Sequence, residues 1–164
     1  EQSRLLKASP VTFQKMGLMD MVLGQTDRNS GNWMINSHGE IKAIDNARVL
    51  STNQRFRPLD TYTKESLPSA AFGKIDPEAK QSLLKLTPER LEEILKARRI
   101  PAIYRHFSKR NLRRVQELLR SDASFGEIVE EMSRITAVDF VPYAIVAAGA
   151  AGTAGVVYGI KSEN

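Results

Sequence analysis

The sequence contains no cysteine, and His38 and His106 are its only histidines. The absence of cysteine excludes disulfide frameworks, cysteine zinc sites, iron–sulfur clusters and thiol nucleophiles. Two histidines are too few for a metal centre built mainly from histidine. Alternating β/α units are also lacking, which argues against a doubly wound nucleotide-binding fold. The first ten residues lack the apolar segment of a secretory signal.

The composition is that of one folded domain. The chain has 164 residues, of which 41% are hydrophobic and 26% charged, so it is long enough to bury a core and too apolar to remain disordered. Lys and Arg number 24 against 19 Asp and Glu, a formal net charge of +5. This excess favours an anionic partner, and by itself leaves nucleic acid, phospholipid and nucleotide open.

The C-terminal end has a different character. Residues 140–160 carry no charge over a length that could span a bilayer. Their alanines and glycines, including Gly155 and Gly159 four residues apart, suit close helix packing in a membrane. An Ala/Gly-rich helix buried against a soluble core has the same pattern, so both interpretations stay open.

The segment 10–23 has the signals of a helix. Ser9-Pro10 combines an N-cap residue with a first-turn proline, and Gly24 follows as a stop. Apolar residues recur in it at nearly helical spacing, namely Val11, Met16, Met19 and Leu23. The polar residues 25–31 then predict a loop.

A β-hairpin is predicted next. The short apolar runs 33–36 and 41–44 are separated by Ser37-His38-Gly39, a turn sequence in which a turn role suffices for His38. Residues 47–75 show no sustained periodicity, which predicts a long, partly ordered loop.

The rest of the chain up to residue 134 is predicted to be helical. Four N-cap signals occur in it, at Asp76-Pro77, Thr87-Pro88, Ser108 and Ser124. The helix expected after Ser108 has one apolar face, formed by Leu112, Val115, Leu118 and Leu119. The predicted fold class is therefore α+β and predominantly α, with one small hairpin.

Three oxygen-bearing side chains are arranged around the predicted hairpin. Asp27 lies in the preceding loop, Asn32 ends that loop, and Asp45 follows the second strand. An antiparallel pair returns the chain to its starting end, which would bring Asn32 and Asp45 together as Mg²⁺ ligands. Asp27 would orient a hydroxyl and accept its proton. Phosphoryl transfer requires this combination of groups.

The motif T-D-R-N-S-G-N-W-M followed by A-I-D-N is similar to type II phosphatidylinositol 4-kinases and to bacterial phosphatidylinositol 3/4-kinase-like proteins. The resemblance implies that residues 1–139 form a kinase-like C-terminal lobe, with a catalytic loop at 24–32 and a metal-binding segment at 41–50, followed by the separate tail 140–164. The residue roles that it implies are Asp27 as the catalytic Asp, Asn32 and Asp45 as metal ligands, and Trp33 and Ile44 at the nucleotide. ATP and Mg²⁺ or Mn²⁺ are the implied cofactors.

The sequence departs from ordinary protein kinases in two places. Gln25 and Thr26 stand where those enzymes have His and Arg, and Asn46-Ala47 replace Phe-Gly after the metal-binding Asp. The resemblance also implies an N-terminal lobe with a glycine-rich turn and a phosphate-binding Lys, upstream or on another chain, because only 26 residues precede Asp27.

Positive charge is concentrated in residues 96–120, which hold nine Lys and Arg and one acid, Glu117. A solvated helix face explains such a run, and so does attraction to anionic lipid headgroups. The candidates for the lipid contact are Lys109, Arg110, Arg113 and Arg114. Nucleic acid is a less favoured partner because few aromatic residues lie nearby and no nucleic-acid-binding motif is visible.

These patterns predict an atypical kinase that transfers the ATP γ-phosphoryl group to a hydroxyl, with a phosphoinositide favoured as acceptor. A protein Ser/Thr acceptor, nucleotidyl transfer, and a non-catalytic scaffold derived from a kinase are the alternatives. The expected location is cytoplasmic, with membrane association through the basic stretch and residues 140–160.

Overall fold

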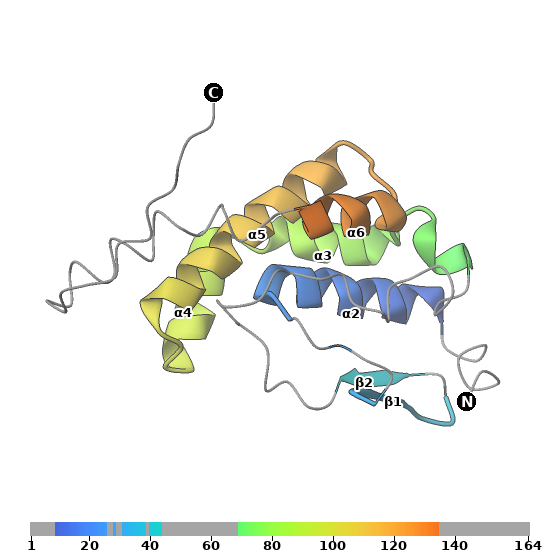
Figure 1. Cartoon of the computed structure of the whole chain (residues 1–164), viewed down its shortest axis with the longest axis horizontal. Helices are drawn as coiled ribbons and strands as arrows, with labels where there is room; N and C mark the ends of the chain where they lie inside the picture. The colour runs from blue at the N-terminus through green and yellow to red at the C-terminus, as the bar shows by residue number, and fades with distance from the viewer. Residues whose placement is uncertain (1–8, 26–27, 29–30, 39, 44–68, 135–164) are drawn as a thin grey trace, which may run out of the picture.

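A computed structural model describes residues 9–25, 28, 31–38, 40–43 and 69–134 of the chain (Figure 1). The described part is mainly helical with one two-stranded sheet, which confirms the predicted α+β class. Its elements are α2 (Pro10–Leu23), β1 (Trp33–Ile35), β2 (Ile41–Ala43), the 3₁₀ helix η2 (Ser69–Phe72), α3 (Pro77–Lys85), α4 (Pro88–Ala97), α5 (Ala102–Arg120) and α6 (Phe125–Arg134).

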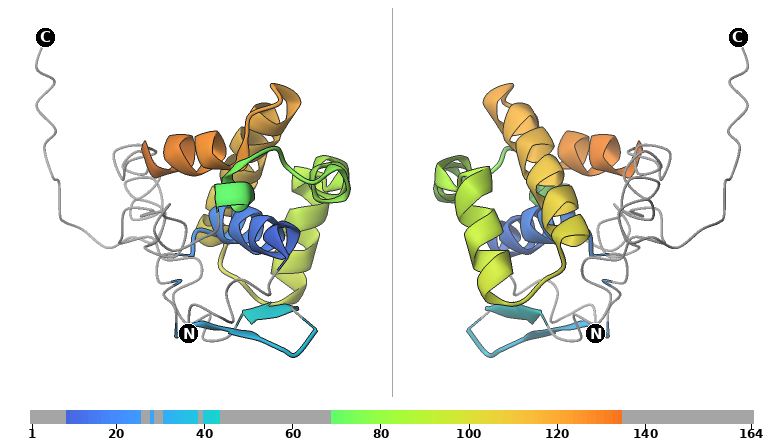
Figure 2. Two further views of the ribbon diagram at one scale, coloured as in Figure 1. Left: turned by 90° about the vertical axis from the view of Figure 1, so that its right-hand side faces the viewer. Right: turned by 90° about the vertical axis from the view of Figure 1, so that its left-hand side faces the viewer.

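The long helix α5 and the helix α2 pack against each other in the centre of the molecule. Helices α3, α4 and α6 surround this pair, and the hairpin lies beyond α2, on the side away from α6 (Figures 1 and 2). Most of the fully buried apolar side chains come from three of these helices, among them Phe13, Met21 and Val22 of α2, Leu112 and Val115 of α5, and Phe125 and Ile128 of α6. The hairpin is thus carried at the edge of a helical core.

Helix α2 has the predicted bounds, but its buried face is not the predicted one. Phe13, Leu18 and Met21 are buried, whereas Met19, placed by its spacing on the apolar face, is 40% exposed. The helix is apolar on most sides, so the spacing does not select one face. Ser9 occupies the N-cap position without making a side-chain cap hydrogen bond. Gly24 ends the helix in the left-handed conformation at φ 65°, which glycine adopts without steric cost.

The hairpin is confirmed, with Trp33 paired to Ala43, Met34 to Lys42 and Ile35 to Ile41. Alternation puts Trp33 and Ile41 on the half-buried inner face, and Met34 and Lys42 on the exposed outer face. The Asn36 side chain organises the turn, because its Oδ1 accepts hydrogen bonds from the backbone N–H groups of His38 and Glu40. His38 is exposed at the tip.

The later helices begin at three of the four predicted caps. Asp76 accepts a hydrogen bond from the Ala79 N–H, and Thr87 from the Arg90 N–H. Ser124 and Glu127 form a reciprocal capping box at α6. The fourth prediction is wrong, since Ser108 is fully buried within α5, which begins at Ala102 after Pro101. A proline before the first turn starts this helix in place of a serine cap.

Three buried side-chain amides fasten the ends of helices to their neighbours. Gln14 donates to the carbonyls of Ala71 and Lys74 and accepts from the Asp76 N–H, so α2 holds the segment that leads into α3. Gln116 of α5 donates to two carbonyls at the end of α3. Asn111 of α5 donates to the Met21 carbonyl near the end of α2. Each amide satisfies backbone groups that helix ends leave unpaired.

The end of the predicted loop 47–75 belongs to the core. It contains η2, with Ala71 fully buried, and the Gly73 carbonyl accepts a hydrogen bond from the first residue of α6. The tail 140–164 and residues 44–68 lie outside the described residues. Among the helices that are described, none has the length and apolar character needed to cross a membrane.

Candidate functional site

Two of the five residues predicted for the catalytic and nucleotide site are described, Asn32 and Trp33. Asp27, Ile44 and Asp45 lie outside the described residues, so their roles stay predictions. Asn32 is 8% exposed and comes directly before β1. Its surroundings therefore show how the predicted catalytic loop is attached to the fold.

The attachment is made by Arg28, which directly follows Asp27. Its guanidinium forms a two-bond contact with the Asp20 carboxylate, Nε to Oδ2 at 2.9 Å and Nη2 to Oδ1 at 3.0 Å. Its Nη1 donates to the backbone carbonyl of Asn32 at 2.7 Å. One side chain thus ties the last turns of α2 to the residue that opens β1.

This contact is secluded from water, with side-chain exposures of 1% for Arg28 and 7% for Asp20. A buried ion pair requires good geometry to offset the loss of hydration, and the planar guanidinium supplies it by matching both carboxylate oxygens. Removing one partner of such a pair leaves an uncompensated buried charge. The arrangement of Asp20, Arg28 and the Asn32 carbonyl, called the loop clamp below, therefore holds the start and end of the loop in one geometry.

The entry into the loop is fixed as well. The Gln25 N–H donates to the Asp20 carbonyl and the Gly24 N–H to the Met21 carbonyl, the pattern of a Schellman turn. Asn111 lies against this turn, with its Nδ2 3.9 Å from the place where a Cβ on Gly24 would stand. Gln25 is fully buried beside it. The chain therefore leaves α2 in a direction set by backbone bonds and by α5.

At the other end of the loop, Trp33 anchors the hairpin to α2. Its ring meets the Phe13 ring edge to face, with centroids 5.5 Å apart and planes at 86°. The next residue, Met34, turns to the opposite side and is 55% exposed. The apolar surface left open beside Asn32 is thus that of Met34, and the bulk of Trp33 serves the contact with the helix.

The donor chemistry of the predicted metal ligands suits Mg²⁺. An amide oxygen from Asn32 and a carboxylate from Asp45 are hard oxygen ligands, which this ion prefers. The hairpin register places Trp33, the residue after Asn32, opposite Ala43, two residues before Asp45 in the sequence. Among the residues that the structure describes, no cluster of three acidic or histidine side chains could hold a metal.

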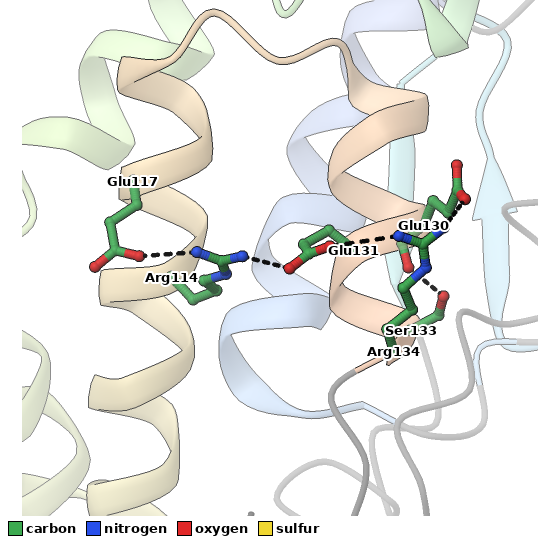
Figure 3. A network of polar contacts seen from close by, with 6 residues as sticks. All are labelled: Arg114, Glu117, Glu130, Glu131, Ser133 and Arg134. Carbon is green, nitrogen blue, oxygen red and sulfur yellow. Dashed lines mark hydrogen bonds and ion pairs between the residues drawn. The ribbon is translucent and has the colours of Figure 1, made fainter.

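The basic stretch 96–120 is partly neutralised by acids from neighbouring helices. Lys109 and Arg105 both pair with Glu92 of α4, and their positive charge lowers the pKa of that carboxyl, chiefly through the Lys109 hydrogen bond. Arg114 bridges Glu117 of its own helix and Glu131 of α6, and these bonds raise its pKa (Figure 3). Two of the four predicted lipid-contact residues therefore have carboxylate partners.

Arg110 and Arg113, the other two predicted lipid-contact residues, have different surroundings. The Arg110 guanidinium lies 6.0 Å from the centre of the Phe107 ring and bonds to the Asn111 side chain, next to the end of α2. Arg113 is exposed, and none of the ion pairs within the described ranges includes it. His106, on the same helix, has a lowered pKa, mainly because it is partly buried and also because Lys109, Arg110 and Arg113 are close. It lies within α5 and is partly buried.

The loop clamp is the feature that sequence patterns miss. Arg28 stands next to Asp27 inside the quoted motif, and Asp20 is the one acid in the otherwise apolar run 16–23. A charged residue within a run of buried apolar positions is a signal for a buried partner. The identity of that partner depends on the return of the loop to α2, which no local spacing encodes.

A family model described as phosphatidylinositol 3- and 4-kinase matches residues 11–126, more than half of the chain. The match includes α2, the loop clamp, the hairpin and helices α3 to α5, and it extends to the start of α6. No curated protein and no solved structure matches the chain significantly. The chain belongs to the phosphatidylinositol 3- and 4-kinase family.

Proposed function

We propose that this chain carries the catalytic loop and metal-binding segment of a lipid kinase that transfers the γ-phosphoryl group of ATP to a hydroxyl of phosphatidylinositol. Membership of the family supports phosphotransfer of the lipid-kinase type in general. The choice of phosphatidylinositol over a protein hydroxyl, and the roles of single residues, are the finer steps of the proposal.

The chain's own residues divide the work as follows. Asp27 orients the acceptor hydroxyl and takes its proton as the new bond to phosphorus forms. Asn32 and Asp45 hold Mg²⁺ or Mn²⁺, which when bound supplies positive charge against the phosphate oxygens. Arg28 contacts no reacting atom in this scheme. It is a positioning residue that fixes the backbone on which Asp27 and Asn32 are carried.

The observation that carries the proposal is the loop clamp. Phosphoryl transfer depends on positioning more than on covalent participation of the protein, so its catalytic groups need a rigid backbone. The three hydrogen bonds from Arg28, at 2.7–3.0 Å, supply that rigidity at Arg28 and at the Asn32 backbone by tying both to α2. A turn serving only as a connection would not require a buried ion pair, whose desolvation is costly.

Met34 is the better candidate than Trp33 for contact with the adenine ring. The flat face of the adenine ring packs against an apolar side chain that is open to it near the phosphate-binding groups. Met34 offers one at 55% exposure, two residues after Asn32, whereas Trp33 is occupied with Phe13. The contribution of Ile44 stays as the sequence predicts it.

The test is transfer of labelled phosphate from ATP, with the chain expressed together with any residues that precede Glu1 in its gene. Phosphatidylinositol in mixed micelles and a mixture of Ser- and Thr-containing proteins are offered as acceptors. We expect label on the lipid, and a loss of about 10²–10⁴-fold in rate for Asp27→Asn with nucleotide binding retained.

His38→Gln is the matched control, because His38 is an exposed polar residue at the hairpin tip. It should leave the rate unchanged. Label on protein and none on lipid would overturn the acceptor assignment. An Asp27→Asn variant as fast as the parent would overturn the role of Asp27.

A further inference from the structure

Six of the nine basic residues of 96–120 fall into two groups once the helices are packed. Three of them, Arg105, Lys109 and Arg114, pair with carboxylates of α4, α5 or α6. At the turn between α4 and α5, Lys96, Arg98 and Arg99 are exposed, and none of the ion pairs within the described ranges includes them. These last three residues are called the turn cations. The exposed positive charge is therefore concentrated at a turn as well as along α5.

The backbone at the turn is well defined. Arg99 donates to the Lys96 carbonyl and Ile100 to the Leu95 carbonyl, which makes a Schellman turn at the end of α4. Arg105 donates from its guanidinium to the Ile100 carbonyl from the first turn of α5, and Pro101 stiffens the connection. The turn cations thus project from a fixed base.

Arg99 occupies a position where arginine is unfavourable. Its φ is 59°, in the left-handed region, at the position of a Schellman turn that glycine usually fills. Within the described residues, two other turns are of this kind, with Gly24 and Asp122 at the equivalent position. Gly and Asp tolerate the left-handed region, and Asp122 also pairs with Lys80. Arg99 has neither advantage within the described residues.

Helix capping does not explain the choice of Arg99. A basic residue in the last turn of a helix interacts favourably with the helix dipole, and Lys96 already supplies that interaction. Glycine would close the turn at lower backbone cost than arginine. A strained residue that does not serve the local fold indicates a requirement from outside the fold.

The α4–α5 turn lies on the same side of the molecule as the hairpin. Figures 1 and 2 show the α4–α5 turn and the β1–β2 hairpin on the same side of α2. The hairpin directly follows Asn32, so the turn cations share a side of α2 with this predicted metal ligand. An anionic surface touching the turn would therefore face the same side as the site.

We propose that the turn cations Lys96, Arg98 and Arg99 are the contact of this protein with an anionic lipid bilayer. The inference rests on the proposed lipid-kinase function, because it is the bilayer that carries the acceptor lipid. It replaces the α5 residues Lys109 and Arg114 as the expected lipid contact, since these are engaged by Glu92 and by Glu117 and Glu131.

The test is co-sedimentation of the full chain with two kinds of vesicle. Neutral vesicles contain phosphatidylcholine alone, and anionic vesicles contain phosphatidylcholine with about 30% phosphatidylserine. Each basic residue near such a surface strengthens partitioning by about fivefold. Replacing all three turn cations by Gln should lower partitioning to anionic vesicles on the order of 100-fold and leave partitioning to neutral vesicles, which reports any contribution of residues 140–160, unchanged.

Lys74, Lys85 and Arg120 form the matched control, since they are exposed cations distributed over other parts of the molecule. Their replacement by Gln changes the net charge by the same amount and should lower partitioning less than about fivefold. An equal loss in both triple variants would overturn the proposal, because it would show that net charge alone drives binding. So would equal binding of the parent chain to neutral and anionic vesicles.

Arg99→Gly separates a membrane contact from a structural role. We expect this variant to melt at the same or a higher temperature, because glycine relieves the left-handed strain, and yet to partition about fivefold less to anionic vesicles. Lower thermal stability with unchanged partitioning would overturn the role of Arg99.

Transfer assays keep this inference distinct from the proposed function. The triple Gln variant at the turn should phosphorylate micellar phosphatidylinositol at the parental rate and vesicle-borne phosphatidylinositol more slowly. Absence of lipid phosphorylation in the parent, together with loss of vesicle binding in the variant, would overturn the proposed function and leave the membrane contact standing.

Discussion

Two guanidinium–carboxylate contacts between segments of this chain, Arg28 with Asp20 and Arg114 with Glu131, differ mainly in their exposure to water. In the loop clamp, Arg28 and Asp20 are 1% and 7% exposed, and the contact is made through two bonds. Between α5 and α6, Arg114 and Glu131 are 41% and 32% exposed and belong to a chain of surface pairs that continues to Arg134 (Figure 3). Similar chemistry therefore has two different physical consequences.

At the surface, water and salt compete for both partners, so such a pair contributes little to stability. In the interior, an intact pair stabilises the fold no more than apolar packing of the same volume would. Removing one partner, however, lowers the free energy of unfolding strongly. The buried contact therefore fixes the position of Arg28 and the Asn32 backbone relative to α2. The exposed contact adds little to the packing of α5 on α6, which apolar residues already hold together. This contrast gives the predictions that follow.

The largest effect is expected for Arg28→Gln. It leaves the Asp20 carboxylate buried without its cation, and we expect a loss of about 3–5 kcal/mol in the free energy of unfolding. Urea denaturation followed by circular dichroism measures it. A loss below about 1 kcal/mol, the range of an exposed pair, would show that the clamp is not a buried ion pair in solution.

The double variant Asp20→Leu with Arg28→Met asks whether the clamp serves stability or position. Replacing both charges by apolar groups removes the buried-charge penalty, and we expect most of the loss of about 3–5 kcal/mol seen in Arg28→Gln to be recovered. Phosphate transfer should stay low, because the Asn32 carbonyl loses the donor that fixes it. A double variant with full activity would contradict the positioning role of Arg28.

An uncharged buried contact should fall between the two extremes. Gln116→Leu leaves the carbonyls of Leu83 and Leu86 without the amide that bonds both, and a loss of about 1–3 kcal/mol is expected from unpaired buried polar groups. Thermal unfolding at matched protein concentration measures it. A neutral result would mean that water replaces the amide at the end of α3.

Arg114→Gln tests the exposed side of the comparison. We expect a change of about 0.2–1 kcal/mol that disappears in 1 M NaCl, since salt screens exposed pairs. The same salt titration on Arg28→Gln should leave its larger loss nearly intact. Equal salt sensitivity of the two variants would remove the distinction between them.

The smallest effect concerns pH. Partial burial and the neighbouring Lys109, Arg110 and Arg113 lower the pKa of His106 below its ordinary value of 6.5, against an opposing influence of Glu92. The unfolded chain then binds the proton more readily than the folded one, so stability is full above pH 6.5 and decreases as the pH falls from there toward the folded-state pKa.

His106→Gln should remove this dependence. We expect its melting temperature to vary less between pH 7 and pH 5 than that of the parent, by a small margin, measured in parallel thermal scans. A parent whose stability rises on acidification through the same range would contradict the direction of the pKa shift.

Local signals in the sequence predict most of the elements. A proline after a cap residue marks the start of α3 and α4, Gly24 marks the end of α2, and the turn sequence 37–39 joins two short apolar runs. These signals act within one turn of chain, so reading them requires no knowledge of tertiary contacts. Ser108 fails because a cap residue type also fits inside a buried helix.

Side-chain partners are much harder to predict. Arg28 meets Asp20 only because the loop folds back on α2, and Lys109 meets Glu92 only because α4 packs on α5. The charge pairing within residues 96–120 is hidden from the sequence for this reason, since Glu92 and Glu131, which pair with Lys109 and Arg114, come from other helices. The motif around Asp27 and Asn32 points to the family, whereas the atoms that hold it in place depend on the fold.

The hydrogen bond from Asn111 to the Met21 carbonyl also bears on how the chain folds. It joins residues 90 positions apart, so α2 leaves the ribosome long before the helix that supports its end. Contacts between residues far apart in the sequence form late, because closing the long loop between them costs entropy before the contact can contribute any stabilisation. The end of α2, where the predicted catalytic loop begins, is therefore expected to be among the last parts of the molecule to reach its native geometry during synthesis.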